Sequence, residues 1–487
     1  MAGVEASGNE RQSPFEEALC LESTEEVLAF RTRGGIPLWA LIRSAALNAV
    51  QSSSAGLVQP WESWRPSRWQ RLRQLGAAAR RRFDASQGRE DRPIAIFTSA
   101  SSCIPSPGGH RNRLTAGFSS TYPDLTVVYE RPDRGGCHPE YHDFEPTVPY
   151  DWEPAKFALL ESVSSRLPSS RQAQGLIKFL RARLGHLVHS EPTWSRLERQ
   201  ASACSHFADA HFAASQQWME SRKPALCMIE DGCYGGMMAL LVGAAKASGI
   251  RVAEYQHSLV TGSHQAYNYG PAINGSDYQK FLPDDFLLWG EFWGEQVRLP
   301  CSRVIIGNPW LSDAVAARPS IPQTTGPERI LVASAGLNPE DLSRFVRELS
   351  AALPGREIVL RIHPSERPTL IARYGALVAQ GVRIDELDLY ESIARSSLVT
   401  GDISSVLFEA TAFGKKVSCR RSAQSDAMNP GEILQTVDSG EECARLSITD
   451  SLPLAEGPPP SPRLWADGWQ ANFRRYVERI LPIIQPG

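Results

Sequence analysis

The sequence predicts an α/β protein made of two doubly wound domains, preceded by a helical N-terminal extension. Three observations support this fold class. The chain has 487 residues, which is more than one hydrophobic core usually organises. Short apolar strands alternate with helical stretches in two regions, a pattern typical of βαβ units and parallel sheets. A segment rich in Pro, Thr and Gly, residues 313–328, separates these regions and is expected to be a linker.

The same patterns divide the rest of the chain. Residues 1–92 are expected to form a helical and basic extension, 93–312 the first α/β domain, 329–450 the second, and 451–487 a proline-rich crossing that ends in a helix. Within the extension, residues 61–83 combine three tryptophans with seven arginines. Such a helix can lie on an anionic membrane surface as a peripheral contact. A solvated helix or linker is the more ordinary interpretation, and it is the one we favour.

The first region is expected to contain six strands, two helical stretches and a long loop at 131–155. The strands are predicted at 94–98, 125–130, 225–229, 251–256, 284–290 and 303–310, and the helices through most of 156–222 and at 237–248. The loop after the first strand is rich in Ser and Gly and ends in Arg111 and Arg113. It matches neither of the common glycine-rich phosphate motifs.

Polar residues follow two strands of this region, where parallel sheets bind ligands. Glu230 and Asp231 come directly after strand 225–229, and Gln256 and His257 close the next strand. Two adjacent carboxylates raise each other's pKa, which suits a general base. The alternative is that both carboxylates only cap the helix that follows.

The second region shows the same alternation, and it contains two further polar strand ends. Residues 358–362 form a strand that breaks at His363 and Pro364, and residues 398–400 form a strand followed by Gly401 and Asp402. A helix, a short strand near 382–384 and a helix at 388–395 are expected between them. The last helix is expected to begin at Ser404-Ser405 and to end at Gly414.

The start of that last helix is a candidate phosphate site. The first N–H groups of a helix have no partner within the helix and carry partial positive charge, and two serine hydroxyls add donors. Glu409 lies one turn beyond Ser405 on the same face, where a carboxylate can hold ribose hydroxyls. The alternative is that the serines only cap the helix and Glu409 is a surface charge. A capping box does not explain Glu409. The acidic residue of such a box lies three positions after the cap, and from Ser404 or Ser405 that position holds Leu407 or Phe408.

Composition restricts the environment and the partners. The net charge is −3, which gives no reason to expect nucleic acid as a partner. Nine cysteines are scattered without a C-x-x-C motif, which suits a reducing cytoplasm. The polar, acidic N-terminus is unlike a signal peptide, and no apolar run approaches the roughly 20 residues that span a bilayer. We therefore expect a cytoplasmic protein, with contact at the inner membrane face only through 61–83.

Three short motifs resemble those of bacterial sialyltransferases with the GT-B architecture, in which two Rossmann-like domains face a cleft. Glu230-Asp231-Gly232 resembles their D/E-D/E-G motif, His363-Pro364 their HP motif, and Ser404-Ser405 their paired serines. The segments AEYQHSLVTGSHQAYNYG, FLLWGEFWGE and IIGNPWL resemble capsule and lipopolysaccharide biosynthesis proteins. The resemblance covers roughly residues 225–417. It departs at Ser258, where those proteins usually carry Gly after the Q-H pair.

The resemblance implies a metal-independent glycosyltransferase that needs no cofactor beyond its nucleotide-sugar donor. Asp231, or less readily Glu230, would take the proton of a glycan acceptor hydroxyl, and a protonated His363 would stabilise the leaving phosphate. The residues expected to contact the nucleotide-sugar donor are Ser404, Ser405, Glu409, Arg361, Pro364 and Gly401. Gln256 and His257 are secondary candidates for contact with donor or acceptor, and Arg361 is also secondary. The donor expected is CMP-linked, with sialic acid or Kdo as the sugar.

Three other functions remain open at this point. The chain could be a related transferase that moves a polyol phosphate, or a sugar-nucleotide epimerase of the same fold. It could also be a non-catalytic glycan-binding or scaffold protein that keeps the two-domain shell.

Overall fold

The computed structural model describes most of both α/β regions. The described residues are 13–55, 92–106, 109–132, 147–150, 167–317, 328–336, 338–429, 433–449 and 463–481, with 76, 156 and 163 in addition. Most of the basic segment 61–83 lies outside them, so the membrane contact expected there stays a prediction. Among the described helices, none combines the length and apolar composition that crossing a bilayer requires.

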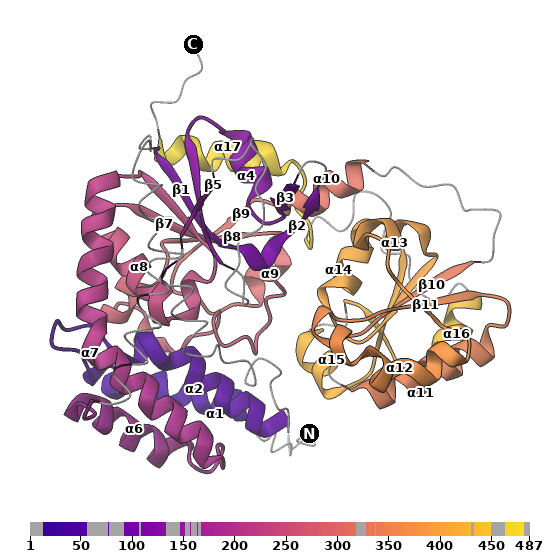
Figure 1. Cartoon of the computed structure of the whole chain (residues 1–487), viewed down its shortest axis with the longest axis horizontal. Coiled ribbons are helices and arrows are strands. Elements are labelled where there is room, and N and C mark those ends of the chain that lie inside the picture. Colours follow the sequence, from indigo (N-terminus) through magenta and orange to yellow (C-terminus); the bar gives the residue numbers. More distant parts are fainter. Residues whose placement is uncertain are drawn as a thin grey trace, which may run out of the picture.

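A seven-stranded parallel sheet forms the centre of the first domain (Figure 1). Its strand order is β5-β4-β1-β6-β7-β8-β9, so the chain runs from β1 to one edge and then reverses to place β6 on the other side of β1. The strands are β1 (Ile94–Ser99), β4 (Thr126–Arg131), β5 (Thr147–Pro149), β6 (Leu226–Ile229), β7 (Arg251–Tyr255), β8 (Asp285–Leu288) and β9 (Ser302–Ile305). The central strands are buried on both faces, which explains their continuous apolar sequences.

Helices cover both faces of this sheet and connect its strands. They are α4 (Ala116–Thr121), α6 (Arg171–Leu184), α7 (Glu191–Arg222), α8 (Gly236–Ala247), α9 (Glu291–Glu295) and α10 (Pro309–Ala317). Two differences from the predicted elements stand out. The predicted last strand ends at Ile305 because Pro309 begins α10, and α10 extends into the predicted linker 313–328, whose residues 318–327 lie outside the described part. The serine-rich loop after β1 contains an antiparallel hairpin of β2 (Cys103–Ser106) and β3 (Gly109–Asn112).

The N-terminal helices pack onto the first domain rather than standing apart from it. Helix α1 (Pro14–Leu19) packs on α2 (Leu38–Ala55), and α2 contacts α6, α7 and α8. The C-terminal helix α17 (Trp469–Ile480) also returns to this domain, where Phe473 packs on Phe118 with ring centroids 4.8 Å apart. Figure 1 shows both ends of the described chain on the first domain.

The second domain is a six-stranded parallel sheet of order β12-β11-β10-β13-β14-β15. Its strands are β10 (Arg329–Ala333), β11 (Glu357–Arg361), β12 (Arg383–Ile384), β13 (Leu398–Gly401), β14 (Lys416–Arg420) and β15 (Gln435–Val437). Its helices are α11 (Pro339–Ala352), α12 (Leu370–Ala379), α13 (Leu389–Arg395), α14 (Ser405–Ala412), α15 (Ala423–Met428) and α16 (Gly440–Ile448). The predicted fold class is therefore confirmed: the protein has two doubly wound Rossmann-like domains and N-terminal helices.

Helix α14 of the second domain is in contact with the first domain. The rings of Phe408 and Trp293 have centroids 5.4 Å apart, and the indole N–H of Trp465 donates to Thr411 Oγ1 at 3.1 Å. The helix that begins at the paired serines is thus fixed by contacts from both halves of the chain.

Candidate functional site

The strand order places both groups of predicted site residues at chain reversals. In each sheet the order reverses beside the first strand, between β1 and β6 and between β10 and β13. Open parallel sheets bind ligands at such reversals, outside the carboxyl ends of the strands. Glu230 and Asp231 directly follow β6, and Asp402 and Ser404 follow β13. The two groups therefore occupy the equivalent ligand-binding position of the two domains.

Glu230 is bound to the neighbouring strand and is nearly inaccessible. Its Oε2 accepts hydrogen bonds from Thr98 Oγ1 at 2.8 Å and from the Ser99 N–H at 2.6 Å, and the residue is 6 % exposed. Burial raises its pKa, and the charge of Asp231 raises it further. Its side chain points to β1 and does not cap α8, which begins after Gly235 without a side-chain cap.

Asp231 has the opposite electrostatic situation, because an arginine and a histidine side chain face it. Arg131 Nη2 donates to its Oδ2 at 3.0 Å, and His257 Nε2 lies 3.3 Å from its Oδ1. Burial acts to raise the pKa of Asp231, but His257 and Arg131 outweigh it and the pKa is lowered. The expectation that both carboxylates have raised pKa values is therefore wrong for Asp231, which is held ionised. Its backbone is left-handed, with φ of 64°.

The two residues that close β7 are placed differently from each other. His257 faces Asp231, and its Nδ1 is buried without a hydrogen-bond partner in the described residues. Gln256 was predicted to contact donor or acceptor, but its amide is used internally: Oε1 accepts from the Trp289 N–H and Nε2 donates to Ser258 O. Ser258 does not have the positive φ that would favour glycine, so the departure from Gly requires no strained backbone.

Glu254 binds the turn that follows Asp231, and it was not predicted as a site residue. Its carboxylate is fully buried and accepts hydrogen bonds from the Cys233 N–H at 2.7 Å and from Tyr267 Oη at 2.8 Å. Burial raises its pKa to about 7, although His257 and these hydrogen bonds act to lower it. Glu254 thus holds the turn that contains Asp231, and its carboxyl group titrates near neutral pH.

This titration makes stability depend on pH. Because the folded-state pKa of Glu254 lies near 7 and its ordinary value is 4.5, the free energy of unfolding should fall as pH rises between these values. The total loss should be about 3 kcal/mol. Glu254→Gln mimics the protonated form and should remove this part of the pH dependence. Urea unfolding of both proteins from pH 4 to pH 8 measures it. Equal pH slopes in the two proteins would show that Glu254 does not titrate in this range.

In the second domain, His363 lies in a turn that is held by a buried acid. The His363 side chain is exposed, and its N–H donates to Glu366 Oε2 at 3.0 Å. Glu366 is 1 % exposed and also accepts from Ser334 Oγ at 2.6 Å and from Tyr374 Oη at 2.7 Å. Pro364 begins the 3₁₀ turn Pro364–Thr369. The imidazole is therefore presented to solvent from a rigid backbone.

Arg361 does not present a free cation, which differs from its predicted role in contacting the donor. Its Nη1 donates to Asp385 Oδ2 at 2.6 Å and to Leu387 O at 3.0 Å. Arg329 binds the other oxygen of the same carboxylate at 2.7 Å. Since Asp385 is buried between two arginines, Arg361 is held as part of a structural ion pair beside the strand ends.

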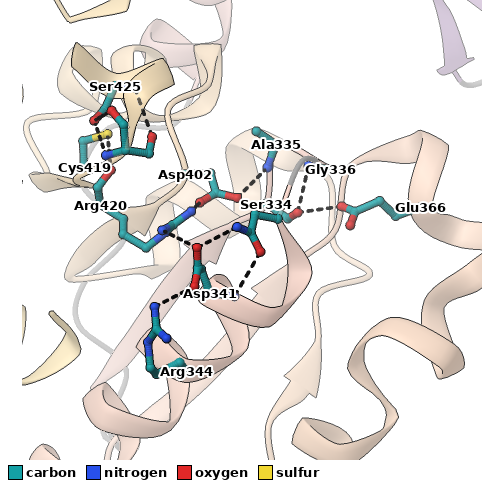
Figure 2. Close-up of polar contacts among 12 residues, drawn as sticks. Ser334, Ala335, Gly336, Asp341, Arg344, Glu366, Asp402, Cys419, Arg420 and Ser425 are labelled. Carbon is teal, nitrogen blue, oxygen red and sulfur yellow. Dashed lines mark hydrogen bonds and ion pairs between the residues drawn. The ribbon is translucent and has the colours of Figure 1, made fainter. Parts of the chain in front are cut away.

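A second network ties the loops around β13 together (Figure 2). Arg420, at the end of β14, donates to Asp402 Oδ1 through Nε at 2.9 Å and through Nη2 at 2.7 Å. Asp402 Oδ2 accepts from the Ala335 N–H at 3.4 Å, in the loop after β10. Gly401 has φ of 125°, and a Cβ there would lie 2.2 Å from Ala333 O. Glycine is therefore required at the point where the chain turns toward Ser404.

The start of α14 has unsatisfied polar atoms. Ser404 occupies the cap position, but its hydroxyl caps nothing and its Oγ is buried without a partner among the described residues. The hydroxyls of Tyr390 and Ser405 act to lower the pKa of Glu409, against the rise that burial causes. Glu409 is 4 % exposed, and its Oε2 also has no partner there. Burial raises the pKa of Glu409, so the interpretation of Glu409 as a surface charge is wrong.

Comparison with known proteins gives structural likeness only. No protein-family model and no curated protein matches the chain. Similar solved structures include S. aureus MnaA with UDP (12 % identity, 82 % of this chain and 99 % of that one, TM-score 0.47). Another is the glycotransferase of kitacinnamycin, with 14 % identity over 80 % of this chain and 98 % of that one and a TM-score of 0.42. A third is the lipopolysaccharide outer core galactosyltransferase WaaB, with 12 % identity over 79 % of this chain and 99 % of that one and a TM-score of 0.38. At these values the strand order, and not the likeness, carries the fold assignment.

Proposed function

We propose that this chain is a metal-independent GT-B glycosyltransferase that moves a sugar from a nucleotide-sugar donor to a surface polysaccharide or lipopolysaccharide acceptor. One observation carries the proposal: at the chain reversal of its sheet, each domain places polar groups that can act on a substrate. In the first domain this is Asp231, an ionised carboxylate in a polar setting. In the second it is the start of α14, where Ser404 Oγ and Glu409 Oε2 are buried without partners among the described residues.

In the proposed reaction Asp231 accepts the proton of an acceptor hydroxyl while that oxygen attacks the anomeric carbon of the donor. The bond from this carbon to the phosphate oxygen breaks, and the nucleotide leaves with the bonding electrons. The α14 N–H groups, the two serine hydroxyls and His363 would stabilise the charge on the departing phosphate. Glu409 would accept hydrogen bonds from the ribose. Glu230 is the weaker candidate for the base because its Oε2 is already bound to β1.

The donor in this proposal is a CMP-linked acidic sugar such as sialic acid or Kdo. This choice rests on the three short motifs alone, and it is the part of the proposal most readily tested. A polyol-phosphate transferase, a sugar-nucleotide epimerase and a non-catalytic glycan-binding protein are separated from it by which nucleotide binds and which group is transferred.

The test is a thermal-shift screen of the protein with CMP, CDP, UDP and GDP. A nucleotide that binds only the folded state raises the melting temperature, and CMP should give the largest rise. Ser404→Ala should abolish this rise without lowering the stability of the unliganded protein, because the Ser404 hydroxyl makes no cap hydrogen bond.

Ser439→Ala is the matched control. The Ser439 hydroxyl does cap α16 and accepts from the Glu442 N–H at 3.1 Å, so its loss should cost about 1 kcal/mol and leave the nucleotide shift unchanged. A preference for UDP or GDP would discard the acidic sugar. No shift with any nucleotide would overturn the glycosyltransferase proposal in favour of the non-catalytic alternative.

A further inference from the structure

Arg113 occupies a rigid position at the end of the β2–β3 hairpin. The preceding residue, Asn112, is 2 % exposed, and its Nδ2 donates to Ser99 O at 3.0 Å and to Glu130 Oε2 at 3.2 Å. Its Oδ1 accepts from the Leu114 N–H at 3.1 Å, and the Arg113 N–H itself donates to Ser102 O at 3.2 Å. The backbone on both sides of Arg113 is therefore anchored to the carboxyl end of β1.

The guanidinium of Arg113 has no internal acceptor, in contrast to the other arginines of the site. Arg131, Arg361 and Arg420 each bind a carboxylate at 3.0 Å or less. Arg113 is half-buried at the edge of a small pocket that Gln256, Trp289 and Asn308 also line, yet no hydrogen bond or ion pair engages its side chain within the described residues. A guanidinium that no carboxylate of the described chain engages is available to an anionic ligand that reaches this pocket.

The charge of Arg113 is directed at the second domain. It acts on the carboxylate of Glu409, where it opposes the rise in pKa that burial causes, and also on Tyr390 of α13. Figure 1 shows the β2–β3 hairpin on the side of the first domain that is turned toward α13 and α14. The charge of Arg113, a residue of the first domain, thus influences the polar groups near the start of α14 in the second domain.

We propose that Arg113 is the first domain's contribution to the donor site and that it binds a phosphate of the nucleotide. The inference rests on the proposed function and deepens it. With Glu409 engaged by the ribose, the adjacent anion available to the guanidinium is the phosphate at the start of α14. Arginine suits this role because its planar donors match phosphate oxygens in pairs. A phosphate held from both domains would also couple donor binding to the contact between them.

Isothermal titration of the full chain with CMP, UDP, cytidine and uridine tests the inference. Arg113→Ala should raise the Kd of the nucleotide that binds by roughly 10- to 100-fold, since hydrogen bonds to charged groups are worth about 1.5–3 kcal/mol. The Kd of the matching nucleoside should not change. Arg113→Lys should give an intermediate loss, and it keeps the test valid if the alanine variant does not fold. Arg111→Ala, in the same hairpin but stacked over Trp310, is the control and should bind like the wild type.

The outcomes separate this inference from the proposed function. A wild-type protein that binds no nucleotide overturns both. A wild-type protein that binds a nucleotide which Arg113→Ala binds equally well overturns only the inference. Equal weakening of nucleotide and nucleoside also overturns it, because Arg113 would then act on the ribose or on Glu409 and not on phosphate.

Discussion

Asp231→Asn is expected to lower the rate of sugar transfer by about 10²- to 10⁴-fold, the usual contribution of a positioned general base. Asparagine removes the proton acceptor and keeps the size of the side chain. It also tolerates the left-handed backbone at this position, where φ is 64°. Alanine would add backbone strain to the loss of the carboxylate, so asparagine is the cleaner variant. Initial rates with a nucleotide-sugar donor, together with nucleotide affinity, give the measurement.

The pH profile provides a second readout for Asp231. His257 and Arg131 lower its pKa below the ordinary value of 3.8, so the base form should persist through the mildly acidic range. Protonation of Asp231 should therefore not lower the rate of sugar transfer between pH 5 and pH 7. Glu230→Gln is the control and should retain most of the activity. Wild-type rates in Asp231→Asn, with nucleotide binding intact, would assign the base to another residue.

Much of the fold followed from the alternation of apolar strands and helices. The strands β1, β6, β7, β10, β11 and β13 lie in the sheet interiors and are mostly apolar and buried. β7 is an exception in one position, because it contains Glu254. The hairpin β2–β3 and helix α10 were missed because prolines and small residues in both segments also suit loops. Strand order could not be read from the sequence, since it depends on contacts between distant segments such as β1 and β6.

Most of the candidate site was predicted from polar residues that closely follow a strand. Asp231, His363 and Ser404 satisfy that rule, and the structure places them at strand ends. Arg131 satisfies it too, as the last residue of β4, and the same rule applied to that strand would have found it. Glu254 and Glu366 gave no such signal. Their roles arise from burial and from hydrogen bonds to Tyr267 and Tyr374, which only the folded chain brings together.

The helices within residues 13–55 gave no functional signal in the sequence, yet they are bound to the loop that follows His257. Arg43 is fully buried and forms an ion pair with Glu22, which is 1 % exposed. The same guanidinium donates to the carbonyl oxygens of Gln265 and Asn268. Glu22 Oε2 also accepts from the Gly270 N–H at 2.8 Å, and a Cβ at Gly270 would lie 2.5 Å from that of Glu22. Residues 22 and 43 therefore hold the loop 265–270 through its backbone.

Arg43→Ala should consequently lower the free energy of unfolding by about 3–5 kcal/mol, because it leaves the Glu22 carboxylate buried without its counter-charge. Urea unfolding at pH 7 measures this loss. Arg31→Ala is the matched control: its ion pair with Asp277 also joins the N-terminal segment to the first domain, but it is exposed. Its loss should therefore cost at most about 1 kcal/mol.

The double variant Arg43→Met with Glu22→Gln separates the ion pair from simple loss of packing. With both charges removed, no unpaired charge stays buried, and the double variant should cost less than the sum of the two single variants. Additive costs would mean that the two side chains stabilise the loop independently. A cost for Arg43→Ala as small as that of Arg31→Ala would mean that the loop is held by other contacts. In that case the N-terminal helices would cover the first domain without supporting the loop that follows His257.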